Sequence, residues 1–130
     1  MIWFEAQVFD YVYDKVKDLV PAGCFKNVYN PAPPKFPFAT LREISNTDER
    51  SRMSTSTVQE YATVGYEANV YAEDRYQAME IMCAIDSAMY SFNFERISSD
   101  SPDNLLDPEL FRVTNRYRAG VSKDGVFFRP

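Results

Sequence analysis

Hydrophobic and polar positions change their period within residues 66–82, "YEANVYAEDRYQAMEIM". Up to Tyr71 the apolar residues alternate with mostly polar ones, and after Asp74 they recur every three or four positions. Alternation is typical of a half-buried strand, and the longer period is typical of an amphipathic helix. We therefore predict a strand over residues 61–72 that runs almost directly into a helix capped by Asp74. No glycine and no residue of a catalytic type stands at the junction.

Two helices follow from the three-to-four-residue period. One face of the second helix carries Ala78, Ile81, Met82, Ile85, Met89 and Phe92. The same pattern predicts an earlier helix that ends at Pro21, with its apolar stripe on Phe4, Val8, Tyr11, Val12, Val16 and Leu19.

The remaining apolar segments predict strands. Residues 24–30 form a short strand candidate, the four prolines of 31–37 favour an extended connector, and 38–44 is a strand. A long strand over 111–121 is followed by an Asp-Gly turn and a hairpin partner in "VFFRP". This order predicts one α+β domain over 1–130, a mostly antiparallel sheet with two helices packed on one face. We expect its core to contain Val64, Tyr66, Val70, Ile81, Ile85, Met89, Phe111 and Val113.

Two polar stretches interrupt this pattern: residues 45–58, "SNTDERSRMSTSTV", and the turn-rich loop 98–109. A polar run as long as 45–58 in a small domain favours disorder or a binding role. We predict an arm that orders on a partner. Its candidate contact residues are Thr47, Asp48, Glu49, Arg50, Arg52 and Met53.

The composition argues against several classes of function. Fourteen basic and nineteen acidic residues give a net charge of −5, which disfavours a free nucleic-acid binder. The chain has no histidine, the commonest general base and metal ligand. It has no phosphate-binding glycine loop, and its acidic cluster at 100–109 lacks the spacing of a calcium site. We expect no enzyme activity, no cofactor and no metal, and two buried, reduced cysteines, Cys24 and Cys83.

Three arginines stand out on the last long strand. Alternation places Arg112, Arg116 and Arg118 on one face, opposite Phe111 and Val113. The simplest interpretation is a solvent-facing strand with scattered charges. The functional one is a basic strip that faces a neighbouring subunit, with acidic residues such as those in 100–109 as partners, or a lumen that carries DNA.

Several segments together resemble the tail terminator (tail completion, head–tail joining) proteins of long-tailed bacteriophages. They are "FPFATLREISNT", "YATVGYEANVYAE" leading into "AMEIMCAIDSAM", and "FRVTNRYRAGVSKDGVFFR". The similarity covers roughly residues 35–130, with Ala72 where relatives often carry a small polar residue.

The resemblance implies a homo-oligomeric ring, a hexamer, at the head-proximal end of the tail tube. Such a ring ends tube polymerisation and contacts the tube protein and the head connector protein. Phage DNA passes through its lumen without sequence-specific binding. The expected location is the virion, after assembly in the bacterial host cytoplasm. Two alternatives stay open: a connector or neck protein of the same assembly, and a monomeric α+β ligand-binding or enzymatic domain.

Overall fold

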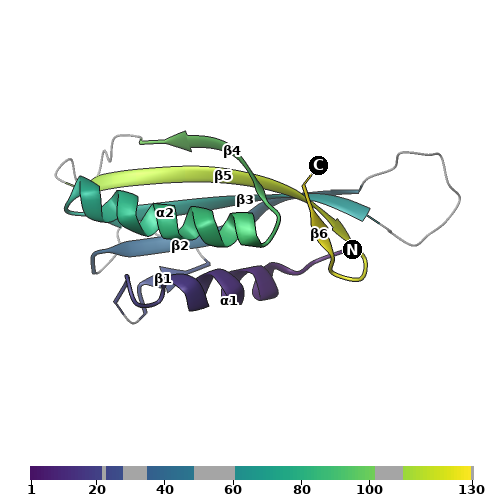
Figure 1. Cartoon of the computed structure of the whole chain (residues 1–130), viewed down its shortest axis with the longest axis horizontal. Coiled ribbons are helices and arrows are strands. Elements are labelled where there is room, and N and C mark those ends of the chain that lie inside the picture. Colours follow the sequence, from purple (N-terminus) through teal and green to yellow (C-terminus); the bar gives the residue numbers. More distant parts are fainter. Residues whose placement is uncertain (22, 28–34, 49–60, 102–109, 130) are drawn as a thin grey trace, which may run out of the picture.

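A computed structural model describes residues 1–21, 23–27, 35–48, 61–101 and 110–129 of the chain. It confirms the α+β class and the mostly antiparallel sheet (Figure 1). In chain order the elements are α1 (Glu5–Val16), β1 (Phe25–Lys26), β2 (Phe38–Asp48), β3 (Tyr61–Ala72), α2 (Arg75–Ser91), β4 (Glu95–Asp100), β5 (Phe111–Ser122) and β6 (Phe127–Phe128).

The sheet has the order β1-β2-β3-β5-β4, and β6 pairs with the far end of β5. Among the strands that the structure describes, only the short β1–β2 pairing is parallel. The centre is the long β3–β5 ladder, in which Tyr61 lies opposite Ser122 and Ala72 opposite Phe111. β3 therefore has a long neighbour on both sides, and both of its faces are buried from Tyr66 to Ala72.

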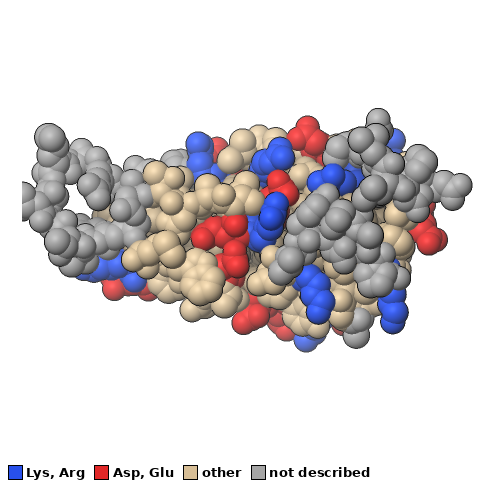
Figure 2. Space-filling view, turned by 180° about the vertical axis from the view of Figure 1, so that it is seen from behind, with Lys and Arg blue, Asp and Glu red and all other residues tan. Residues whose placement is uncertain are grey.

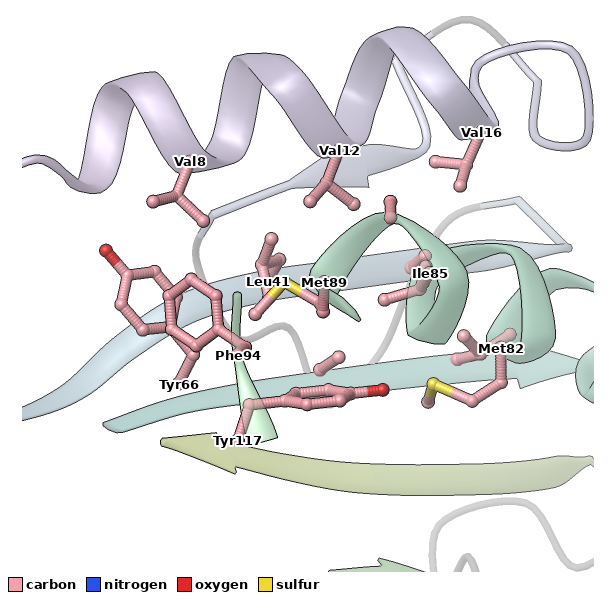
Figure 3. Packing of buried hydrophobic residues seen from close by; sticks show 14 of the residues in the cluster. Val8, Val12, Val16, Leu41, Tyr66, Met82, Ile85, Met89, Phe94 and Tyr117 are labelled. Atoms are coloured by element: carbon pink, nitrogen blue, oxygen red, sulfur yellow. The ribbon is translucent and has the colours of Figure 1, made fainter. Parts of the chain in front are cut away.

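Both helices cover the same face of the sheet, as predicted, because each carries one apolar stripe. Val8, Val12 and Val16 of α1 point down toward the sheet, and Met82 and Ile85 of α2 lie between them and the strands (Figure 3). Alternate residues of β3 complete this core: Ala62, Val64, Tyr66, Ala68, Val70 and Ala72. No helix of the described residues lies on the opposite face of the sheet, and we call it the open face (Figure 1).

The junction between β3 and α2 is built by a helix cap. The Asp74 carboxylate accepts a hydrogen bond from the backbone N–H of Tyr76 at 3.1 Å, which satisfies one free donor of the first turn. At the other end Asn93 takes a positive φ of 68°, and Phe94 N–H donates to Met89 O, as in a Schellman motif. The Asn93 amide also donates to Phe127 O at 3.1 Å, which attaches the β6 hairpin to the end of α2.

Aromatic rings close the core beneath this hairpin. The Phe127 ring lies 4.7 Å from that of Phe92 and 5.5 Å from that of Phe94, measured between centroids. The Tyr66 ring contacts Phe94 edge-on at 5.0 Å. Residues far apart in the chain are thus joined at one end of the molecule.

Several predictions on element boundaries and burial were wrong. α1 ends at Val16 and not at Pro21, so residues 17–20 lie outside the helix. β2 continues to Asp48, so residues 45–48 are strand and not arm. Residues 98–100 belong to β4 and not to the turn-rich loop. β4 was missed because it is an edge strand that pairs only with β5, so both of its faces tolerate polar residues. Phe111, at the start of β5, is 46% exposed and lies outside the core.

Candidate interaction surface

The open face carries a row of alternating charges across the middle of the sheet (Figure 2). Register explains the row, because Arg42 of β2 and Arg116 of β5 both lie directly opposite Glu67 of β3. The Glu67 carboxylate is 3.7 Å from the Arg42 guanidinium and 3.3 Å from that of Arg116. Its side chain is only 11% exposed, whereas the arginines reach solvent. A nearly buried acid is thus neutralised by two cations that stay hydrated on one side.

Asn69 links this charge row to the next row of the sheet. Its side-chain NH₂ donates to Glu67 Oε1 at 3.0 Å. Its carbonyl oxygen accepts from Arg112 Nε at 3.2 Å, Arg112 Nη2 at 3.1 Å and Thr114 Oγ1 at 2.6 Å. Asn69 is fully buried, so its amide is held by neighbours on both sides. The network gives the open face a polar centre of fixed geometry.

The three predicted arginines point to the same face, as strand alternation requires. Arg116 also approaches Asp100 at 3.8 Å, and Arg118 pairs with Glu95 at 3.0 Å. The acidic partners seen here therefore come from β3 and β4 of the same chain. One of them, Asp100, belongs to the acidic cluster at 100–109. Sequence reasoning assigned acids of 100–109 to a neighbouring subunit and missed Glu67 and Glu95, because the pairing of β5 with β3 and β4 is not visible in the local pattern.

The predicted arm is placed only in part. Thr47 lies in β2 opposite Thr63, and Asp48 ends the same strand opposite Ala62. The other candidate contact residues of the arm lie outside the residues that the structure describes: Glu49, Arg50, Arg52 and Met53.

A second polar group, which sequence reasoning missed, lies on the helix side near the start of α1. The Glu43 backbone N–H donates to the Glu5 carboxylate at 2.7 Å, and the Asn46 amide donates to Ile2 O at 2.6 Å. The Tyr66 hydroxyl points to this end of α1 (Figure 3). Burial raises the pKa of Glu43, and the nearby Glu5 carboxylate adds to that shift. These hydrogen bonds attach the N-terminal segment to β2, and the desolvation of the carboxylates opposes part of that stabilisation.

A third polar network joins α2 to the sheet. The Tyr117 hydroxyl donates to Asp86 at 2.9 Å and accepts from the Asn115 amide at 2.8 Å. Arg96 of β4 lies 3.3 Å from the same Asp86 carboxylate. Burial raises the pKa of Tyr117 above its ordinary range, so the hydroxyl remains a hydrogen-bond donor.

Neither cysteine belongs to the polar networks described above. Cys24 is buried, as predicted, but Cys83 is exposed on α2, so the expectation of two buried cysteines was wrong. Both thiols are free. Among the described residues, no three Cys, Asp or Glu side chains gather as a metal site would require. In the same part of the chain, neither helix has the length and apolar character to cross a membrane.

Comparison with known proteins shows what this arrangement resembles. No protein-family model and no curated protein sequence matches the chain. Among solved structures, a chain in the virion of a native gene transfer agent (GTA) particle matches with a TM-score of 0.62. That match has 12% sequence identity and covers 88% of this chain and 93% of the other. The two chains share a fold over nearly their whole length.

Proposed function

We propose that this chain is a structural subunit of a phage-like virion, and more narrowly that it forms a ring at the head-proximal end of a tail tube. There it ends tube polymerisation and joins the tail to the head connector. The observation that carries the proposal is the fold shared with a chain of a gene transfer agent virion along nearly the full length of both. The tail-terminator role itself rests on the resemblance of residues 35–130 to that family.

The open face supports a structural role over a catalytic one. Its central polar side chains, Glu67 and Asn69, are engaged with arginines and a threonine of the same sheet. A nucleophile or general base needs a free face toward a substrate. In our proposal the protein is not an enzyme and needs no cofactor.

The arginines fit a subunit interface better than a DNA-lined channel. Arg116 and Arg118 are already paired with acids of their own sheet, which weakens their field toward a distant polyanion. Strong phosphate contacts would also retard DNA that must slide through a lumen. We place the open face against a neighbouring subunit, while DNA passes through the ring without sequence-specific binding.

Electron microscopy of the purified protein mixed with tail tubes of its own phage tests the proposal. We expect added density at one end of each tube and no further growth when tube protein is supplied. A protein that remains a single chain at high concentration and leaves tube ends bare would refute the role. Pull-down with tube protein and with connector protein separates the terminator from a neck protein, which should bind the connector alone.

The polar arm gives a second test. Replacing residues 49–57 with a short Gly-Ser linker leaves β2 and β3 intact, so the variant should fold and keep its thermal stability. If the arm contacts the tube, this variant should yield overlong tails. Tails of normal length would mean that the arm only connects the two strands and does not contact the tube.

A further inference from the structure

The outward surface of α2 has an unusual composition for a helix that covers a sheet. Tyr76, Met79, Cys83 and Tyr90 are all exposed and recur at three, four and seven positions, so they form one stripe. This stripe lies on the side of α2 opposite its buried residues, where charged side chains are the norm. Tyr76 alone is 83% exposed. A continuous exposed stripe of aromatic and sulfur-containing side chains indicates a contact surface.

Charge differs between the two sides of the molecule. Residues 73–91, which hold α2 and its cap, contain four acids and the single base Arg75. Among the described residues of the open face, register places five basic residues and three acids. The basic ones are Lys26, Arg42, Arg112, Arg116 and Arg118, and the acids are Glu67, Glu95 and Asp100. The N-terminal half of the α2 side is therefore acidic, through Glu73, Asp74 and Glu80, whereas Arg96 and Arg129 offset the charge toward the end of the helix. The described part of the open face is basic.

The open face also has an apolar end. Phe128 lies over Gly120, and its ring contacts the Tyr61 ring edge-on at 6.0 Å. Ile44, at the bulge in β2, lies beside Gly65, and all three of these apolar side chains are at least 40% exposed. The exposed part of the open face thus offers apolar and basic groups, and α2 offers apolar and acidic groups over about 25 Å.

We propose that the outer stripe of α2 of one copy of this chain lies on the open face of the next copy. The proposal rests on the ring of the preceding section and says which two surfaces form its contact. Exposed tyrosines of α2 would lie against arginines, a contact already present within the chain, where Arg129 lies 5.1 Å from the Tyr90 ring and Arg112 lies 5.6 Å from the Tyr71 ring.

Charge also decides the symmetry of this contact. Two open faces would bring basic residues together, and two α2 stripes would bring Glu73, Asp74 and Glu80 together. Like charges facing each other across an interface disfavour both arrangements. The contact is therefore head-to-tail, and contacts of that kind close into rings when the rotation between subunits permits.

Charge reversal on either surface tests the inference. The first variant, Glu73→Arg with Glu80→Arg, makes the α2 side basic; the second, Lys26→Glu with Arg118→Glu, makes the open face acidic. Each variant alone should assemble at least tenfold more weakly than the wild type, judged by light scattering. An equimolar mixture should regain assembly, because the basic α2 of the first variant then meets the acidic face of the second.

Cross-linking locates the contact without changing charge. Ser45→Cys places a thiol on the open face, and the native Cys83 supplies one on α2. A bismaleimide should give a ladder of covalent dimers, trimers and larger species that disappears when Cys83→Ser is added. Lys123→Cys, on the exposed hairpin turn, is the matched control and should give no ladder.

The outcomes separate the inference from the proposed function. Two outcomes would show that this contact is wrong while leaving the ring intact. In the first, the wild type assembles but no cross-linked ladder depends on Cys83. In the second, the mixed variants do not assemble although circular dichroism shows that both are folded. If Cys83 alone links wild-type copies into dimers and nothing larger, the contact is α2 against α2. A wild-type protein that neither assembles nor binds tubes overturns both proposals.

Discussion

Replacing Asn69 with leucine should test whether the polar centre of the open face stabilises the fold. Leucine has the same branching and the same number of side-chain heavy atoms, but it is larger and offers no hydrogen bonds. The change removes the acceptor used by Arg112 and Thr114 and the donor used by Glu67. Thr114 is buried, so its hydroxyl would lose its partner without gaining water, whereas the Arg112 side chain is only partly buried.

The magnitude follows from these contacts. A hydrogen bond contributes a net of about 0.5–1.5 kcal/mol, and a buried group left without a partner costs about 1–3 kcal/mol. Part of the loss is recovered because Arg112 can rehydrate and leucine adds apolar burial. We expect Asn69→Leu to lower the free energy of unfolding by about 2–4 kcal/mol. In a domain of this size that corresponds to a fall in Tm of roughly 6–20 °C.

Urea unfolding, followed by circular dichroism at protein concentrations where the mass is that of one chain, measures the effect. Thr114→Val is the matched control and should cost about 1 kcal/mol, because it removes one hydroxyl and leaves the other bonds of Asn69. The double variant should cost less than the sum of the two by about 0.5–1.5 kcal/mol. A loss below about 0.5 kcal/mol for Asn69→Leu, or strict additivity in the double variant, would refute the view that these groups act as one network.

Three further predictions concern the core, the hairpin and the carboxylate pair. Ile85→Ala should cost about 2–5 kcal/mol in urea unfolding, because Ile85 is fully buried beneath α1; an unchanged midpoint would contradict its place in the core. Gly120→Ala should displace the Phe128 ring and cost about 1–3 kcal/mol, seen as a changed near-UV circular dichroism spectrum; an unchanged spectrum would mean that the ring does not lie there. Since folding raises the pKa of Glu43, its carboxyl stabilises the fold below the unfolded pKa, and this contribution is lost as pH rises through the folded value. Glu43→Gln should therefore gain stability relative to wild type between about pH 4 and pH 7, and a difference that is flat with pH would argue against the desolvated pair with Glu5.

Local periodicity was enough to predict where the main elements lie and which of their faces carries the core, although β3 buries both faces from Tyr66 to Ala72 and not only the one that alternation predicts. The strand over 61–72, the helix face through Ile85 and the cap at Asp74 were all confirmed. Each depends on side chains within a few residues of one another, and the 2.0 and 3.6 periods report which side of an element is buried. The same reasoning correctly placed the three arginines on one face of β5.

What the arginines contact was decided only by the tertiary structure. β3 pairs with β5 across the whole of α2 and β4, so Glu67 meets Arg116 over a sequence separation that no local pattern records. The contacts of the buried Asn69 likewise depend on the neighbouring strands, which place Thr40 and Thr114 directly opposite it. β4 was missed because an edge strand buries neither face enough to impose alternation. The period of the sequence reports which face of an element is buried. The side chains that a residue contacts depend instead on the order and register of the strands, which exist only when the whole sheet has formed.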